Sequence, residues 1–421
     1  MKRVVLLFLG CLSGLMMIQP AEAQQTIADS LRSELMAHTA QDTVRIRLLV
    51  NLAKEITGTD PTYTLGLCDE AITQSRKFNT KKWEIKALMQ KALALDKLNR
   101  VPMAKELLLQ GYQLAIAISD SLEMGLMQAN LGNICLNAGE AEEALRYFQN
   151  AESIFRSIGD LYRSSRAADM TGVCYSLLAN YPKALSSHLK ALAGLEELKR
   201  FPELANCHMN IGNVYNYLDE QEKSRESYRK SLEIYEKLHD LRGMANVKTN
   251  LGISYQDYFQ DRSIACGYYA DALEIFTLIG DRYTRLQPLV NMACLLNNLC
   301  ESDFNEYLRN GIFKGLDQGI LNQYEMSSKL LREALDLLNV RMNWGFYIYV
   351  MGTLGESMMY LNRYQEGLSC CFRALDVADS LNLMERKRET LNSISKIYER
   401  SGRYDSAYYF YRQCIAVRDS I

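Results

Sequence analysis

The sequence has little proline, glycine, histidine or net charge for its length. Its 421 residues include 6 Pro, 24 Gly and 4 His, and 48 basic against 50 acidic side chains give a formal charge of −2. So few chain-breaking residues exclude collagen-like and disordered classes and favour long helices. Direct binding of nucleic acid is not expected, because it depends on clustered Lys and Arg and the sequence has no basic block.

Long apolar runs are also missing, apart from one at the N-terminus. Lys2 and Arg3 precede the apolar stretch 4–18, and Ala21-Glu22-Ala23 follows as an A-x-A cleavage motif. This order is typical of a secretory signal peptide over residues 1–23, and the stretch is shorter than the about 20 residues of a membrane helix. We expect cleavage before Gln24 and a periplasmic or secreted protein. The alternative is an N-terminal membrane anchor.

Residue patterns that carry catalysis or bind metal are absent from the sequence. It has no HExxH, CxxC, G-x-S-x-G or glycine-rich phosphate loop. The four histidines, His38, His188, His208 and His239, form no pair at metal-ligand spacing. We therefore predict no enzyme activity, no cofactor and no metal site, unless an activity is tied to the inserted residues 298–323 described below.

What the sequence does contain is an internal repeat. Three segments align, Asn130-Leu-Gly-Asn-Ile-Cys135, Asn210-Ile-Gly-Asn-Val-Tyr215 and Asn250-Leu-Gly-Ile-Ser-Tyr255, and each precedes a small residue, an aromatic one and a second small one. The small residue in the third position of each segment marks the phase of nine copies. Successive phase positions differ by 39, 40 or 41, except for one difference of 355 − 293 = 62. The phase residues are Ala53, Ala92, Gly132, Gly172, Gly212, Gly252, Ala293, Gly355 and Ser395.

The spacing G-x2-[YC]-x8-A-x3-[FY]-x2-A resembles the tetratricopeptide repeat (TPR), a hairpin whose small residues let helix A and helix B approach closely. A period of 40 exceeds the common period of about 34 and is similar to that of kinesin light chains and Pins-type polarity adaptors. The resemblance implies an all-α fold, a right-handed superhelical α-solenoid of about nine TPR helix hairpins. Residues 24–41 are expected to form an N-terminal cap helix. Residues 42–421 form the array, with an insertion at about 298–323 as an extra helix or flap.

The repeat phase also places the cysteines, the turns and His188. Cys135 and other cysteines fall in or beside helix-contact columns, so the ten cysteines after Gln24 are expected to be buried free thiols. The adjacent Cys370 and Cys371 are the pair for which a disulfide stays most open. Ser119-Asp120, Gly159-Asp160, His239-Asp240 and Gly280-Asp281 are typical of turns in which Gly can end one helix and Asp can cap the next. His188 occupies the aromatic column of its copy and is expected in the core.

By resemblance to TPR superhelices, the A helices line a concave groove. We number the positions along each A helix so that the phase residue is the eighth, and we call the equivalent positions of all copies a column. Columns two, five or six, nine, and twelve or thirteen then share one helix face. Asn recurs in these columns although it is a mediocre helix former. The predicted ligand-binding residues of the groove are Asn130, Asn133, Asn137, Asn206, Asn210, Asn213, Asn216, Tyr217, Asn246, Asn250, Asp257, Asn291 and Asn297.

Two interpretations of these asparagines stay open. A carboxamide offers a donor and an acceptor, so it can bridge the N–H and C=O of an extended peptide. The column-six set is similar to the asparagine ladder of the O-linked N-acetylglucosamine transferase superhelix and to the Asn of the chaperone-type carboxylate clamp. Because the clamp's basic residues are missing beside the central asparagines, an internal segment is favoured over a C-terminal carboxylate. In the other interpretation, the asparagines bond neighbouring A helices to each other.

These features predict an extracytoplasmic scaffold that binds a protein or extended peptide in the Asn-lined groove. The alternative is the sensor region of a Bacteroidota TPR transcriptional regulator or kinase without its membrane helix and output domain. The N-terminal signal, the leading helix, Asp60-Pro61 and residues 417–421 resemble parts of such a region. A membrane protein is then a further expected partner. The last helix, with Ala407-Tyr-Tyr-Phe-Tyr411, lacks a polar terminal cap. It is therefore expected to pair with another chain, or the architecture continues beyond it.

Overall fold

The computed structural model describes residues 21–259, 261–282, 284–313, 316, 319–320, 322–338 and 344–420. Most of the predicted signal peptide, residues 1–20, lies outside this range, as do parts of the insertion. Within the described residues every regular element is a helix, which confirms the all-α prediction.

The helices are α1 (Ala21–Ala37), α2 (Thr43–Ile56), α3 (Pro61–Lys77), α4 (Lys81–Lys97), α5 (Val101–Ala117), α6 (Ser121–Asn137), α7 (Ala141–Ser157), α8 (Leu161–Leu177), α9 (Tyr181–Glu197), α10 (Phe201–Tyr217), α11 (Gln221–Leu238), α12 (Leu241–Ser254), the π-helical turn η1 (Tyr255–Phe259), α13 (Arg262–Leu278), α14 (Leu286–Leu296), α15 (Glu301–Arg309), α16 (Gln323–Leu338), α17 (Trp344–Tyr360), α18 (Tyr364–Ser380), α19 (Met384–Arg400) and α20 (Tyr404–Ser420).

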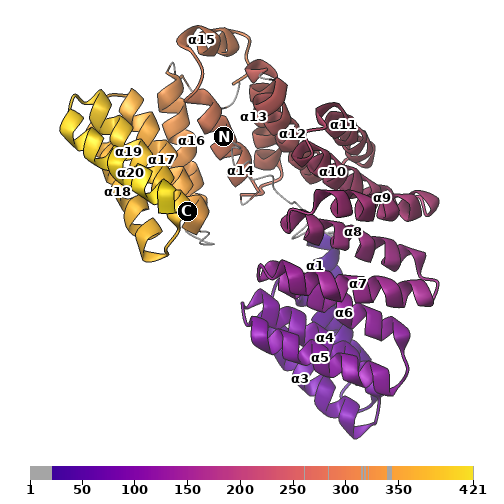
Figure 1. The fold of residues 1–421 in the computed structure, drawn as a ribbon. Coiled ribbons are helices and arrows are strands. Elements are labelled where there is room, and N and C mark those ends of the chain that lie inside the picture. Colours follow the sequence, from indigo (N-terminus) through magenta and orange to yellow (C-terminus); the bar gives the residue numbers. More distant parts are fainter. Residues whose placement is uncertain are drawn as a thin grey trace. The chain divides into compact units, whose positions relative to one another are not determined.

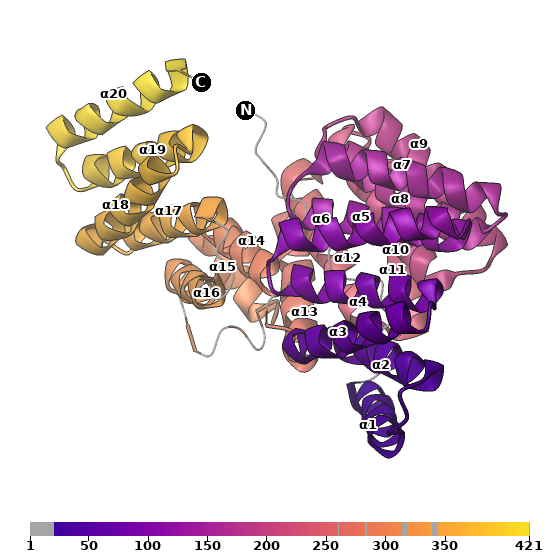
Figure 2. The ribbon, with the colours of Figure 1, turned by 90° about the horizontal axis from the view of Figure 1, so that it is seen from below.

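The described helices form the predicted hairpins of an α-solenoid (Figure 1). Each of the nine phase residues falls in an A helix, namely α2, α4, α6, α8, α10, α12, α14, α17 and α19. The next helix in the chain is the B helix of the hairpin, except that α14 pairs with α16 because α15 lies in the insertion. Consecutive helices therefore pack on one another, as Figure 2 shows for α17 to α20.

The chain divides into two compact units, at the boundary between Ser227 and Tyr228 within α11. The first unit holds α1 to α10 and the start of α11. The second holds the rest of α11 and the helices from α12 to α20.

In several hairpins a glycine on helix A lies directly against a ring on helix B, whereas in α17–α18 Gly355 faces the Cys371 thiol. A Cβ atom built on Gly132 would lie 2.8 Å from the Phe148 ring, and one on Gly252 would lie 2.5 Å from the Tyr269 ring. Both rings are at most 1% exposed. Any side chain at these glycines would push the ring away, so the absence of a side chain sets the distance between the helices.

Short turns reverse the chain between helices at a fixed spacing. The helices from α4 to α10 are all equally long. Their starts follow at one constant interval, as at positions 81, 101, 121 and 141. The residue two positions before each helix start from α4 to α12 has a positive φ. These residues are Asn79, Asn99, Ser119, Gly139, Gly159, Ala179, Lys199, Asp219 and His239. The period therefore imposes the left-handed conformation even where no Gly is present, and the low Gly content does not reflect a lack of turns.

The predicted aspartate caps are confirmed at the helix starts. Asp120 accepts a hydrogen bond from the backbone N–H of Glu123 at 3.1 Å, and Asp160 accepts one from the N–H of Arg163 at 2.9 Å. Each bond satisfies one of the N–H groups that the first turn of a helix leaves without a partner.

The first testable prediction concerns Ala179, whose φ of 56° places it in the left-handed region. This conformation costs an L-residue about 1–2 kcal/mol, and the greater chain entropy that Gly loses on folding offsets part of the gain. Ala179→Gly should therefore stabilise the protein by about 0.5–1 kcal/mol in urea unfolding. The matched change Gly139→Ala, at φ 81° in the preceding repeat, should destabilise it by a similar amount. If both changes act in the same direction, this account of the turns is wrong.

The first helix packs against α2 at the start of the first unit. Ala28 and Leu35 are buried there, and the Arg45 guanidinium donates a hydrogen bond to the carbonyl of His38 at 3.0 Å. Because α1 begins at Ala21, it includes residues on both sides of the predicted cleavage site. No helix in the described part of the chain is long and apolar enough to span a bilayer.

The inserted segment between α14 and α16 carries the short helix α15. Phe304 of this helix is buried and stacks on Phe313, with ring centroids 5.4 Å apart. The Gln323 side chain donates a hydrogen bond to the carbonyl of Leu299 at 2.7 Å. The insertion thus adds its own small aromatic cluster to the second unit.

The ten described cysteines are free thiols, as predicted. Seven of them are buried, whereas Cys294 and Cys370 are half-buried and Cys300 is exposed, which differs from the expectation of uniform burial. Burial raises the pKa of Cys135 and of Cys174 to about 12. These two thiols therefore remain protonated and act as small apolar side chains.

Candidate functional site

The predicted groove residues divide into an accessible group and a buried group. Asn133, Asn137 and Tyr217 are exposed, and Asn130, Asn206, Asn246, Asp257 and Asn291 are half-buried. Asn210, Asn213, Asn216, Asn250 and Asn297 are at most 7% exposed. A partner could reach the side chains of this second group only if the helices moved apart.

Two of the buried asparagines bond one A helix to the next. The Asn210 amide of α10 donates a hydrogen bond to the Asp169 carboxylate of α8 at 3.3 Å. The Asn297 amide, at the end of α14, donates one to the Ser357 hydroxyl of α17 at 2.9 Å. For Asn210 and Asn297 the packing interpretation therefore accounts for the side chain, because a buried carboxamide needs such partners.

The accessible asparagines of the first unit form a row on α6. Asn130, Asn133 and Asn137 follow at steps of three and four and so lie on one helix face; we call them the α6 row. The Asn130 amide donates a hydrogen bond to the carbonyl of Leu126 in its own helix at 2.9 Å, and the Asn137 amide donates one to Asp96 of α4 at 3.0 Å. The exposed Asn133 lies between them.

A charged group beside the α6 row comes from α4. Burial raises the pKa of Asp96 above its ordinary value, and the hydrogen bond from Asn137 partly opposes that shift. The row therefore offers carboxamide donors and acceptors next to a partly buried carboxylate.

In the second unit, polar side chains of α12 and α14 border a narrow cleft of ≈ 10 Å³. Its lining consists of Asn246, Thr249, Asn250, Thr284, Gln287 and Pro288. This volume holds about one water molecule. The Gln287 amide also donates a hydrogen bond to Asn291 at 2.8 Å. The cleft thus holds two predicted residues of α12, Asn246 and Asn250, but it has no room for a side chain of a ligand.

A buried cluster that sequence reasoning missed joins Asp169, His188 and Cys207. The His188 Nδ1 atom lies 2.6 Å from Asp169, and the Cys207 thiol donates a hydrogen bond to the carbonyl of His188 at 3.2 Å. His188 lies in the core over Gly172, as predicted, and is 1% exposed. The residue equivalent to Asp169 is Met in α4 and in α10. A carboxylate in place of an apolar side chain was the signal in the sequence that could have revealed this cluster.

The three side chains of this cluster have the donor atoms of a metal site, all within 4.8 Å of one another. In this structure His188 and Asp169 are hydrogen-bonded directly to each other. Asp169 also accepts the hydrogen bond from Asn210. The arrangement is therefore a buried, hydrogen-bonded pair that ties α8, α9 and α10 together.

The second prediction tests this pair. His188→Phe should cost about 3–5 kcal/mol of unfolding free energy in urea, because it leaves the Asp169 carboxylate buried without its main partner. The double variant Asp169→Met with His188→Phe gives the copy the residue types found at Met209 and Phe148 in other repeats. It should regain most of that stability, short of the natural sequence by about 0.5–1.5 kcal/mol because it also removes the acceptor of the hydrogen bond from Asn210. A single variant as stable as the double would show that the pair is not coupled.

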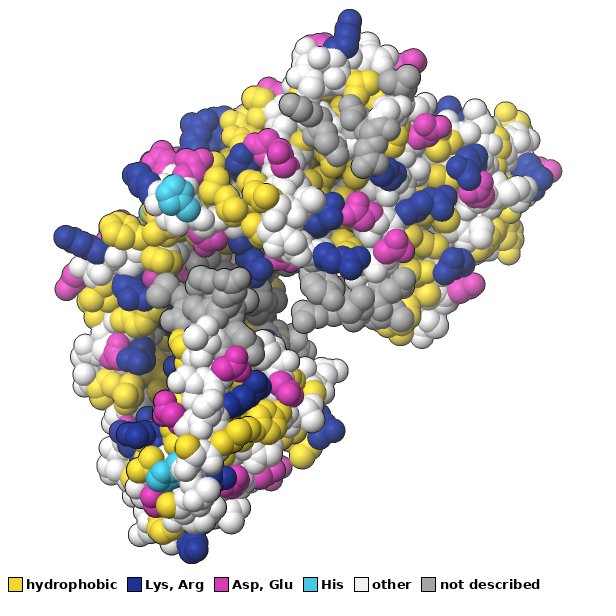
Figure 3. All heavy atoms as spheres, turned by 180° about the vertical axis from the view of Figure 1, so that it is seen from behind, with side chains coloured by type: hydrophobic (Ala, Val, Ile, Leu, Met, Phe, Trp, Pro, Cys, Tyr) yellow, Lys and Arg dark blue, Asp and Glu magenta, His cyan; other side chains and the backbone are white. Residues whose placement is uncertain are grey.

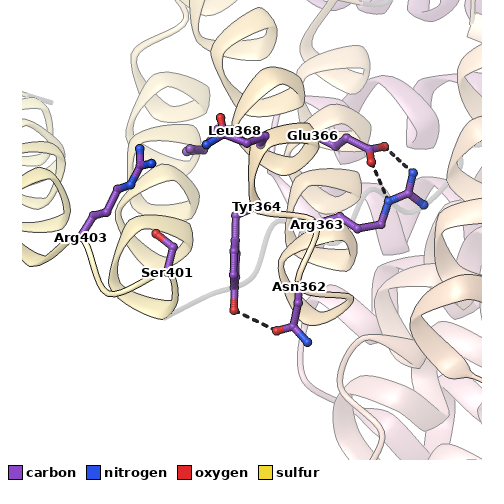
Figure 4. A pocket seen from close by; sticks show the side chains of 8 residues that line it. Asn362, Arg363, Tyr364, Glu366, Leu368, Ser401 and Arg403 are labelled. Atoms are coloured by element: carbon purple, nitrogen blue, oxygen red, sulfur yellow. Dashed lines mark hydrogen bonds and ion pairs between the residues drawn. The ribbon is translucent and has the colours of Figure 1, made fainter.

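A larger hollow of ≈ 340 Å³ lies at the turns that precede α18 and α20. Figure 4 shows the Tyr364 ring with Ser401 and Arg403 on one side and Asn362 on the other. The Tyr364 hydroxyl donates a hydrogen bond to the Asn362 side chain at 2.8 Å. The Arg363 guanidinium pairs with Glu366 at 2.6 Å. None of the predicted groove residues lines this hollow.

A missing ring explains the hollow. Elsewhere a Tyr at or near the start of helix B stacks on a Tyr at the end of the next A helix. Tyr181 stacks on Tyr217 at 4.7 Å, and Tyr324 stacks on Tyr360 at 4.5 Å. Tyr364 begins the B helix α18, and the last residue of the next A helix, α19, is Arg400 and not a Tyr. The Arg400 guanidinium lies 5.1 Å from the centre of the Tyr360 ring. The space beside Tyr364 is left open, so the hollow follows from repeat packing.

The surface charges are mixed. Figure 3 shows Lys and Arg interspersed with Asp and Glu over the face that it draws, without a block of one sign. This distribution agrees with the near-zero formal charge of −2.

Comparison with known families identifies tetratricopeptide repeats in three parts of the chain. Tetratricopeptide repeat models match residues 123–197, 205–238 and 389–420, which correspond to α6–α9, α10–α11 and α19–α20. No curated protein sequence matches the chain significantly.

Solved structures share the fold at low sequence identity. A Rap protein in complex with competence and sporulation factor matches with a TM-score of 0.54 and 13% identity, over 90% of this chain and 99% of that one. The apo form of the quorum sensor NprR from B. thuringiensis matches with a TM-score of 0.53 and 14% identity, over 94% of this chain and 99% of that one. A signal transduction ATPase with a tetratricopeptide repeat sensor from Pyrococcus horikoshii matches with a TM-score of 0.54 and 14% identity, over 87% of this chain and 54% of that one. These likenesses establish an α-solenoid of the tetratricopeptide type.

Proposed function

We propose that the protein is an extracytoplasmic scaffold that holds an extended segment of a partner protein against the A helices of its first unit. The segment lies along the α6 row. The accessibility of this row carries the proposal, because buried asparagines such as Asn210 already serve contacts between helices. A matched fold, that of the Rap protein, was solved with competence and sporulation factor bound, which supports a binding role and gives no support for catalysis.

The chemistry of the row suits the backbone of a partner. Each carboxamide has two N–H donors and an oxygen acceptor, so Asn133 can pair with both an N–H and a C=O of an extended chain. A hydrogen bond of this kind contributes about 0.5–1.5 kcal/mol net. Several are therefore needed for micromolar binding, which the three residues of the row and their neighbours on adjacent A helices can provide.

The third prediction concerns partner capture. Affinity purification with the natural protein and mass spectrometry identify the partner, and the double variant Asn133→Ala with Asn137→Ala should bind it at least tenfold more weakly. Both side chains are exposed, and Ala is the better helix former. Melting temperature and helicity should therefore stay nearly unchanged.

Gln110 supplies the matched control. It is an exposed carboxamide on the B helix α5, away from the A helices. Gln110→Ala should leave binding as it is. Equal loss in both variants, or full binding by the double variant, would contradict the assignment of the row.

The proposed location rests on the signal-like residues 1–23. The fourth prediction is that expression of the full chain in a Gram-negative host yields a periplasmic protein whose intact mass begins at Gln24. Leu7→Arg, within the apolar stretch, should keep the protein in the cytoplasm at its full mass. A cytoplasmic natural protein would contradict the location, and a membrane-bound one of full mass would indicate the anchor.

A sensor region is the second candidate function. Two matched structures are described as sensors, NprR and the tetratricopeptide repeat sensor of the P. horikoshii ATPase. In this case the partner recovered by affinity capture would be a membrane protein, whereas a soluble partner favours the free scaffold.

A further inference from the structure

The last helix, α20, carries a stripe of large exposed side chains. Tyr404, Tyr408 and Tyr411 are 70%, 64% and 50% exposed. With the half-buried Ile415 they follow at steps of four, three and four, so they lie on one face of the helix. We call these four residues the α20 stripe. The flank next to the stripe, with Ala407 and Cys414, is buried.

The same columns are covered in the preceding repeat. The residues that correspond to the α20 stripe there are Tyr364, Leu368, Cys371 and Leu375 of α18. Leu368 and Cys371 are 5% and 0% exposed, and they share an apolar cluster with Ile394 and Ile397 of the next A helix, α19. The α20 stripe is therefore a docking surface for a helix, continuous with the interface that each repeat makes with the next. Within the described residues no helix follows α20 to cover it.

The charges that flank the α20 stripe favour a second copy of the same helix. If two α20 helices pair in antiparallel fashion, Tyr404 of one faces Ile415 of the other, and Tyr408 faces Tyr411. In this register the exposed Asp405 of one copy lies opposite the exposed Arg412 of the other, because both residues are on the same flank. The two-fold symmetry makes this contact twice.

We propose that the protein forms a homodimer in which two α20 helices pair antiparallel through the α20 stripe. Tyr is a favourable residue for such an interface, since it combines a large apolar ring with a hydroxyl that tolerates water in the free chain. Neither Asp405 nor Arg412 has an ion-pair partner among the described residues of a single chain, so both are available to the second copy.

Sedimentation equilibrium of the purified protein tests the dimer. Asp405→Arg and Arg412→Asp should each weaken dimerisation at least tenfold, because each change creates two like-charge contacts. The double variant Asp405→Arg with Arg412→Asp restores opposite charges and should recover the dimer to within about threefold of the natural protein. This rescue is specific to a second copy, since any other partner would meet reversed charges.

Tyrosine variants supply the controls. Tyr408→Ser with Tyr411→Ser should abolish the dimer without loss of helicity, because both side chains are exposed. Tyr409→Ser, at a 60% exposed position off the stripe, should leave the dimer intact. A natural protein that stays monomeric at about 0.1 mM, a dimer that survives the stripe variant, or a double charge variant that stays monomeric would each overturn the proposal.

Discussion

The close approach of helix B at a small residue of helix A is the interaction on which the rest of the structure depends. Because Gly132 has no side chain, the Phe148 ring lies directly against the α6 backbone, and the same holds for Gly252 and Tyr269. The close approach fixes how each hairpin is built. The hairpin can then present one face of each helix to the next repeat. Packing of one repeat on another follows from this geometry, as it does in repeat proteins generally.

The architecture was largely predictable from the sequence because this contact leaves a periodic trace. The phase of the small residues located all nine A helices, and aspartates such as Asp120 located helix starts. Turn conformation was less visible. Ala179 and Lys199 have positive φ because helix length and spacing require it, and neither residue type carries that information locally.

The candidate site was predictable only in part. A column identifies the direction in which a side chain leaves its helix, so Asn133 and Asn213 seemed equivalent, yet one is exposed and the other 1% exposed. The difference comes from neighbouring helices, which the pattern within one helix does not encode. The Asp169–His188 pair was missed for the same reason, since its members are in different helices. Consequently, the structure reduces a long list of asparagines to a short accessible row.

Both proposed surfaces consist of side chains that packing between the helices leaves accessible. On the A helices, polar side chains that are not needed between helices remain available to the backbone of a partner. On α20, large side chains stand where a neighbouring repeat would otherwise be. A partner bound on the first unit and a second copy bound through α20 would occupy separate parts of the chain.

Site-specific photo-crosslinking tests the central claim most directly. A photoreactive amino acid is placed at position 133 on α6 or at position 110 on α5, and each protein is exposed to the captured partner. The account predicts crosslinks from position 133 to consecutive residues of one extended partner segment and none from position 110. Crosslinks from position 110 alone, or from both positions equally, would contradict it.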